Sequence, residues 1–167
     1  MSRIESGVFP VYENVFKIGT AGRNSTDSDM ATVADLETFS VSYDNNVEEW
    51  TPMTTEGWKR RLVTGKSFSI SLSGKRHIGD TGNDYAASFA WKSGQDTETV
   101  FEWDMPDGTV IKFDCVVNLT SDGGDSTNVS GLEFEVLSNG KPTVTFPDGT
   151  ENSGETDSGS GDDTTGT

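Results

Sequence analysis

The sequence predicts a mainly β protein with one short α-helix. Several segments alternate apolar and polar residues with a period of two, which is typical of strands that have one buried and one solvated face. Of the 167 residues, 19 are glycine and 40 are serine or threonine, a composition suited to turns and half-solvated strands. Helical spacing of apolar residues occurs in one segment, residues 80–94.

The clearest strand is predicted at residues 67–73. Phe68, Ile70 and Leu72 fall on one face of this segment, and serines occupy the other. Because successive side chains of a strand point to opposite faces, the apolar side is expected to be buried. Residues 38–44 repeat the pattern and predict a second strand of the same kind.

A long β-hairpin is predicted for the middle of the chain. Its two strands, residues 99–105 and 109–119, both alternate, and the Pro-Asp-Gly sequence at 106–108 has the chemistry of a tight turn. Trp103 is therefore expected in the core. Cys115, the one cysteine, lies on the apolar side of the second strand, so it is expected to be a buried small hydrophobe without an internal disulfide partner.

Further strands are predicted toward the C-terminus. Residues 132–136 alternate again, and Asn139-Gly140 is expected to turn the chain into a strand at 143–146. The sequence Met-Pro-Asp-Gly-Thr at 105–109 is echoed by Phe-Pro-Asp-Gly-Thr at 146–150. No strand is expected after the second copy.

The helix is predicted over about residues 81–94. Asp80 or Asn83 is the candidate N-cap, Tyr85 and Phe89 form an i, i+4 apolar pair, and glycine at 94 is a stop.

The remaining segments are predicted to be irregular. Residues 21–32 and about 44–60 are expected to be loops, the second unusually apolar, and residues 1–20 an N-terminal arm that is either extended or an edge strand. The last 17 residues, 151–167, hold five acids but no basic and no apolar side chain, so they are expected to be a disordered acidic tail or linker. The folded domain is thus expected to span residues 1–150.

The charge excludes some classes of protein. Twelve basic and 28 acidic side chains give a net charge of −16, whereas proteins that grip DNA or anionic membranes need a basic surface. Residues 1–150 still hold 23 acidic and 12 basic side chains. The N-terminus lacks an apolar signal core and no stretch approaches the roughly 20 apolar residues of a membrane span, so synthesis in the cytoplasm is expected.

No catalytic, cofactor or metal site is predicted. His77 is the sole histidine, and the acid-and-glycine turns at 79–84 and 122–125 lack the ligand spacing of an EF-hand, so they are interpreted as surface turns. A nucleophilic Cys115–His77 pair lacks an orienting motif. Phosphate-binding, dinucleotide-binding and nucleophile-elbow motifs are absent from the sequence. Carboxylates spaced i, i+2 on strands are interpreted as a solvated face and not as a glycosidase pair.

The positive charges are clustered. Half of them lie within residues 59–76, with no acid among them, at Lys59, Arg60, Arg61, Lys66, Lys75 and Arg76. Such a segment either meets the acidic face of another copy or folds back on acids of its own chain. Trp50 and Trp58 flank the apolar segment beside it, which is either an interaction surface or a loop tucked over its own core.

Three stretches resemble a known family. Residues 43–53, 56–72 and 79–85, with Lys75-Arg76 before the last, resemble the major tail (tail tube) protein of long non-contractile-tailed bacteriophages of Gram-positive hosts. The close match covers roughly residues 35–90. Tail-tube-like bacteriocins and prophage remnants share the pattern.

The resemblance implies a tail-tube-type β-sandwich or partial barrel with one short flanking helix. It also implies a structural virion protein, not an enzyme, that polymerises as hexameric rings stacked into a hollow tube for DNA ejection. The implied partners are a tape measure protein inside the tube during assembly, tail initiator and terminator proteins, and double-stranded DNA that passes without specific binding. No cofactor, metal or membrane is implied.

Two sets of residues are assigned roles in such a tube. Acids opposite apolar strand positions are predicted to face the lumen, where phosphates would find no cation; they are Glu102, Asp104, Asp114, Glu133 and Glu135, with Ser69 and Ser71 as weaker candidates. Lys112 shares a face with Asp114, which argues against a purely acidic lining. Contacts between subunits and rings are predicted at Val47, Trp50, Met53, Trp58, Lys59, Arg60 and Arg61. The alternative function is a carbohydrate-binding β-sandwich module.

Overall fold

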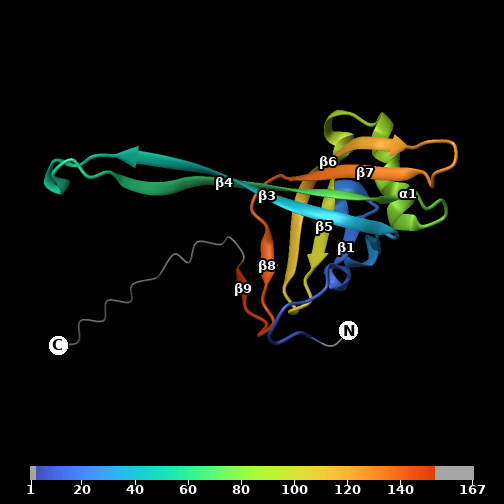
Figure 1. Ribbon diagram of the computed structural model, residues 1–167, viewed down its shortest axis with the longest axis horizontal. Coiled ribbons are helices and arrows are strands. Elements are labelled where there is room, and N and C mark those ends of the chain that lie inside the picture. Colours follow the sequence, from blue (N-terminus) through green and yellow to red (C-terminus); the bar gives the residue numbers. More distant parts are fainter. Residues whose placement is uncertain (1–2, 153–167) are drawn as a thin grey trace, which may run out of the picture.

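One antiparallel sheet organises the molecule in the computed structural model, which describes residues 3–152 (Figure 1). Its strand order is β2-β1-β5-β6-β7-β4-β3, and β8 pairs with β6 while β9 pairs with β8. The strands are β1 (Val15–Gly19), β2 (Met30–Thr32), β3 (Leu36–Trp50), β4 (Arg60–Lys75), β5 (Glu98–Asp104), β6 (Val110–Gly123), β7 (Gly131–Ser138), β8 (Thr143–Thr145) and β9 (Glu151–Asn152). Within the described residues the single α-helix is α1 (Thr81–Ser88). The predicted fold class, mainly β with one short helix, is confirmed.

The sheet is open but strongly curled around its apolar face. Phe16 on β1 lies 4.9 Å from Phe39 on β3, measured between ring centroids, although β1 and β3 stand near opposite ends of the strand order. Trp103 on β5 lies 5.6 Å from the same Phe39 ring. The curl therefore turns one sheet face inward as the core, and the prediction that Trp103 is a core residue is confirmed.

The core is the sum of the inward-facing positions of the alternating strands. Phe101 pairs with Phe113 between β5 and β6, and Val136 of β7 pairs with both Ile70 and Val117. Each large apolar side chain buried in this way contributes roughly 1.5–3 kcal/mol. The alternating patterns seen in the sequence thus become one continuous apolar layer.

The repeated Pro-Asp-Gly-Thr sequences build the same turn twice. The backbone N–H of Met105 donates to the carbonyl of Thr109 at 2.8 Å, and that of Phe146 donates to Thr150 at 2.9 Å. In each turn the aspartate accepts from the threonine N–H, and the glycine has a positive φ, +94° at Gly108 and +84° at the second copy. The predicted hairpin of β5 and β6 is confirmed.

One expectation for the C-terminal region is confirmed and one is wrong. A strand follows Asn139-Gly140, as predicted, at Thr143–Thr145 (β8), and it pairs with Val110–Lys112 at the start of β6. The expectation that no strand follows the second Pro-Asp-Gly turn is wrong, since Glu151–Asn152 pairs with β8 as β9. The predicted tail therefore begins no earlier than residue 153, and its remainder lies outside the described residues.

The segment expected to be a loop at about 44–60 is largely strand. β3 runs to Trp50 and β4 starts at Arg60, so the two strands form a long two-stranded ribbon that projects far from the body (Figure 1). Adjacent Asn45 and Asn46 are poor strand formers by themselves, but cross-strand pairing with β4 overrides their preference. A register shift between Asn46 and Val47 adds one unpaired residue on β4.

The helix is shorter than the predicted span of about 81–94. Asp80, one of the two candidate N-caps, is the N-cap, and its side chain accepts from the Asn83 N–H at 2.9 Å. The Ser88 hydroxyl donates to the Tyr85 carbonyl, which competes with helix continuation. The chain then continues as 3-10 turns over Phe89–Trp91 and Gly94–Thr97.

The N-terminal segment also departs from expectation. Its strand β1 lies between β2 and β5, so it is not an edge strand, whereas residues 3–14 run outside the sheet as an arm. Residues 21–32, predicted as a loop, contain two 3-10 turns and the edge strand β2.

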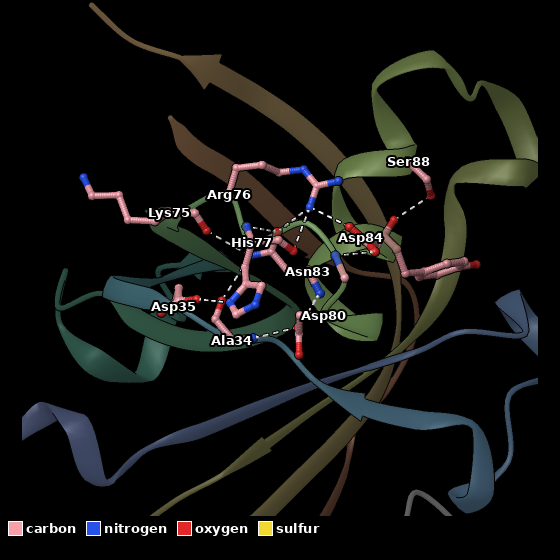
Figure 2. Close-up of polar contacts among 11 residues, drawn as sticks. Ala34, Asp35, Lys75, Arg76, His77, Asp80, Asn83, Asp84 and Ser88 are labelled. Atoms are coloured by element: carbon pink, nitrogen blue, oxygen red, sulfur yellow. Dashed lines mark hydrogen bonds and ion pairs between the residues drawn. The ribbon is translucent and has the colours of Figure 1, made fainter. Parts of the chain in front are cut away.

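A polar network ties the start of α1 to the end of β4 (Figure 2). Asn83 is fully buried; its amide donates to the carbonyls of Ala34 and Lys75 at 3.0 and 2.9 Å. Its side-chain oxygen accepts from Arg76 and from the His77 N–H, both at 2.9 Å. One side chain therefore joins the β2–β3 connection, β4 and α1.

Replacing Asn83 by alanine is expected to lower the free energy of unfolding by about 3 kcal/mol, because it leaves buried donors and acceptors without partners. Urea unfolding followed by circular dichroism measures the loss. Asn139→Ala, at an exposed position, is the matched control and is expected to change little. Equal effects of the two substitutions would contradict the structural role of Asn83.

Candidate functional site

The ribbon is electrically neutral on a strongly acidic chain. Residues 44–66 contain four acids and four bases, whereas the whole chain has a net charge of −16. Trp50 is 42% exposed, Trp58 78% and Met53 102%. The alternative that this segment tucks over its own core is therefore wrong. The ribbon is instead an exposed surface with equal numbers of acidic and basic side chains.

Only weak contacts stabilise the far half of the ribbon from within. Glu49 pairs with Arg61 at 2.6 Å and with Lys59 at 3.1 Å, and Arg60 lies over the Trp50 ring at 5.9 Å. The pKa of Glu49 is lowered by these two cations, Arg61 first. Exposed ion pairs contribute little, and an isolated two-stranded hairpin is marginally stable in water. The far half of the ribbon therefore has little side-chain stabilisation of its own.

The six basic residues of 59–76 were expected either to meet the acidic face of another copy or to fold back on acids of their own chain, and the structure divides them into two groups. Lys59 and Arg61 meet Glu49 on their own chain, and Lys75 and Arg76 meet Glu37 and Asp84. Those four cations fold back on acids of the same chain. Across residues 3–152, by contrast, neither Arg60 nor Lys66 has an acidic group within 4.0 Å.

The register shift in the ribbon decides which residues share a face. Val47 pairs with Val63 across the shift, on the face that carries the Tyr43–Phe68 pair. Four apolar side chains of the ribbon therefore extend the core-side face of the sheet beyond the body. Trp50, paired with Arg60, lies on the opposite face, so the predicted contact residues do not form one patch.

The register also places all the predicted lumen residues on the other face of the sheet. Glu135 of β7 pairs with Ser71 of β4 and with Asn118 of β6, and alternation along these strands brings the rest to the same side. The face opposite the core therefore carries Ser69, Ser71, Glu102, Asp104, Asp114, Glu133 and Glu135. The sequence alone could not show that β1 pairs with β5 and adds Lys17 to this polar face.

This polar face has two parts with different electrostatics. On β1 and β5, Lys17 lies 3.1 Å from Glu102 and 2.9 Å from Asp104, and these carboxylates are 14% and 26% exposed. Lys112 likewise pairs with Asp27. On β6 and β7, Asp114, Glu133 and Glu135 have no cation within 4.0 Å among the described residues. The uncompensated acids thus lie on the β6–β7–β4 part.

In the cluster of Lys17, Glu102 and Asp104, burial is the main cause of a shift in the pKa of one carboxyl group. Burial raises the pKa of Glu102, with the nearby Asp104 carboxylate adding to it and Lys17 opposing it. The pKa of Lys17 is raised, chiefly by its hydrogen bond to Asp104. Glu102 is therefore held next to a like charge, which favours its protonated form.

This predicts opposite pH dependences for two glutamates. Because the pKa of Glu102 is raised by folding, its stabilising contribution is present at low pH and is lost as pH rises through the folded value. The unfolding free energy of wild type relative to Glu102→Gln should therefore fall as the pH rises above about 4.5, the ordinary pKa of a glutamate. For Glu49, whose pKa is lowered, the contribution is lost as pH falls, so wild type relative to Glu49→Gln should show the reverse trend. Urea unfolding at each pH measures both, and parallel trends would contradict the assignment.

The residues tested for other chemistry do not form a site. Burial raises the pKa of Cys115 to about 12, with Asp114 adding to it, so this thiol is a core group; the exposed His77 contacts Asp35 instead. The hypothesis of a Cys–His nucleophile pair is wrong. The turn at residues 79–84 caps α1 and places Asp84 against Arg76. No cluster of three or more metal-ligating side chains occurs in the part of the chain that the structure describes. Among the same residues, every helix is too short or too polar for a membrane span.

Comparison with known proteins gives matches in structure only. No protein-family model matches this chain, and no curated protein matches it. Among solved structures, a chain in the tail of an empty gene transfer agent particle, refined with C6 symmetry, superposes with a TM-score of 0.66. The two chains share a fold. The identity is 18%, over 81% of this chain and 97% of the other.

A second similar structure comes from the virion of a native gene transfer agent particle. Its chain superposes with a TM-score of 0.62 at 20% identity, over 83% of this chain and 99% of that one. At such identities the likeness concerns the fold, and it spans nearly the whole of both tail and virion chains.

Two surface features escaped the sequence analysis. A groove of about 670 Å³ lies where the ribbon leaves the body, between the ribbon root and β8. The N-terminal arm also exposes apolar side chains, with Val8 at 103% and Tyr12 at 79%. Apolar residues at 8–12 were visible in the sequence, but the groove depends on the non-local pairing of β8 with β6.

Proposed function

We propose that this protein is a structural component of a phage-like tail, in which copies polymerise as stacked hexameric rings into a tube through which DNA is ejected. The observation that carries the proposal is the neutral, exposed two-stranded ribbon. It projects from an acidic body, and the acidic bodies of two copies repel each other, whereas the ribbon carries no net charge. A shared fold with a C6-symmetric gene transfer agent tail chain supports sixfold assembly.

The ribbon would supply contacts between subunits and between rings. Its predicted contact residues are exposed, and a neutral surface can approach another acidic copy at less electrostatic cost than an acidic surface can. The position of the tryptophans does not favour the carbohydrate-binding alternative, because neither Trp50 nor Trp58 lines the groove at the ribbon root.

The lumen wall would be the β6–β7–β4 part of the polar face. Asp114, Glu133 and Glu135 there stand beside the hydroxyls of Ser69 and Ser71 without a compensating cation among the described residues. Phosphates passing such a wall meet repulsion and hydration and no binding group. Glu102 and Asp104 would contribute little, because Lys17 compensates them.

In this proposal the protein resides in the virion tail. A tape measure protein would occupy the tube during assembly, initiator and terminator proteins would cap it, and double-stranded DNA would pass without specific binding.

Trp50→Ala combined with Arg61→Ala is expected to leave the fold intact and abolish assembly, because both side chains are exposed in the single chain and have no core role. Negative-stain microscopy and sedimentation at equal protein concentration measure assembly, and circular dichroism measures the fold. Lys92→Ala, on the body surface away from the ribbon, is the control. Normal tubes from the double variant would remove these residues from the interface.

Glu133→Lys combined with Glu135→Lys is expected to retain tubes but make them bind DNA. Two charges per subunit change sign on the proposed wall, so phosphates gain cations where they had none. Retention of labelled duplex DNA by purified tubes, measured against salt concentration, tests this. The matched control is Glu5→Lys with Asp125→Lys, and equal retention by both variants would place Glu133 and Glu135 elsewhere.

A further inference from the structure

The ribbon tip is a largely exposed turn that its own hydrogen bonds hold. The Thr55 hydroxyl contacts the carbonyls of Pro52 and Trp58 at 2.9 and 2.7 Å, and the Trp58 N–H donates to the Thr55 carbonyl at 2.9 Å. These bonds hold Met53 and Trp58 outward, at 102% and 78% exposure. The tip therefore presents two large apolar side chains on a turn closed by local hydrogen bonds.

Glu56 at this tip has an unfavourable backbone conformation. Its φ is +52°, in the left-handed region that a residue with a Cβ avoids, and Gly57 follows at +89°. Glycine or asparagine would fit position 56 with less strain. No cation of the described chain lies within 4.0 Å of the Glu56 carboxylate. Strain at an exposed glutamate points to a use for its side chain outside the single chain.

The groove at the ribbon root has the complementary chemistry. Its wall includes Tyr43, Phe68 and Val144, and two lysines, Lys66 and Lys141, also line it. Within residues 3–152 neither lysine has an acidic partner within 4.0 Å. On a chain of net charge −16, an apolar groove with two uncompensated cations suits an apolar knob that carries a carboxylate.

The tip cannot reach the groove of its own chain. From Lys66 to Arg60 the paired ribbon advances six residues, or about 20 Å at roughly 3.3 Å per residue. Figure 1 shows the tip at the far end of the ribbon and β8 beside its root. A tip–groove contact must therefore join two copies. Because tip and groove are different surfaces, the contact is head-to-tail, the type that generates closed rings or open helices.

We propose that the ribbon tip of one copy docks in the root groove of a second copy, with Met53 and Trp58 against the apolar wall and Glu56 between Lys66 and Lys141. This names the partner surface for the ribbon and rests on the self-assembly proposed above. The segment that follows Asn152, itself a residue of the groove wall, is the competing occupant. It carries acids but no apolar side chain, so it matches the lysines and not the wall.

Charge reversal tests the contact with the full-length chain. Glu56→Lys alone, and Lys66→Glu with Lys141→Glu alone, are each expected to reduce sedimenting assemblies about tenfold, because like charges then face each other. An equimolar mixture of the two variants is expected to assemble like wild type, since every contact between unlike copies is again complementary. Asp125→Lys is the control for the tip change. Failure of the mixture to assemble, or normal assembly of the separate variants, would overturn the proposal.

Disulfide trapping separates this contact from the tube itself. Met53→Cys with Val144→Cys is expected to give an intermolecular ladder on non-reducing gels at high protein concentration, whereas Met53→Cys alone gives no species beyond a dimer. The native Cys115 is buried and does not interfere. A ladder without rings or tubes in the microscope would support the tip–groove contact and contradict the proposed tube. Tubes without a ladder would support the tube and contradict the tip–groove contact. A ladder that appears only after removal of residues 153–167 would assign the groove to that segment and overturn docking of the tip in the intact chain.

Discussion

The register between β4 and β7 determines what this protein presents to its surroundings. Ser71 opposite Glu135 and Ile70 opposite Val136 alternate along the same pair of strands, so hydroxyls and carboxylates lie on one face and the core on the other. A slip of one residue would exchange the two faces completely. The buried aromatic contacts that curl the sheet, among them Phe16 on Phe39, oppose such a slip. Core packing thus holds the polar face in place.

The same constraint explains why the ribbon is conspicuous. Beyond Phe68 the hydrogen bonds between β3 and β4 continue without β7 beside them, and the body no longer covers the apolar side chains. Tyr43, Val47 and Val63 keep the core-side orientation in a place that has no core. Contiguous apolar surface of this kind is uncommon on single chains and marks interaction surfaces. The ribbon is therefore the part of the fold where an interaction surface is expected.

Local patterns in the sequence predicted much of this architecture. The alternation at 67–73, the Pro-Asp-Gly turn at 106–108 and the Asp80 cap each depend on neighbouring residues, and the structure confirms them. What the sequence did not reveal depends on distant partners. β4 turns the expected loop at 44–60 into strand, and β8 reaches back to β6 instead of to β7. The compensation of Glu102 by Lys17 is equally non-local, since the residues are 85 positions apart.

The twin Pro-Asp-Gly turns bring the two ends of the described chain to one corner. A side chain at position 108 would lie 3.5 Å from Pro147 and 3.6 Å from Arg3, and the Ile4 N–H donates to the Pro106 carbonyl at 2.9 Å. The start of the described chain is thus attached to the turn of the β5–β6 hairpin. A peptide grafted ahead of residue 3 would emerge beside both Pro-Asp-Gly turns, so its attachment point is fixed by the fold.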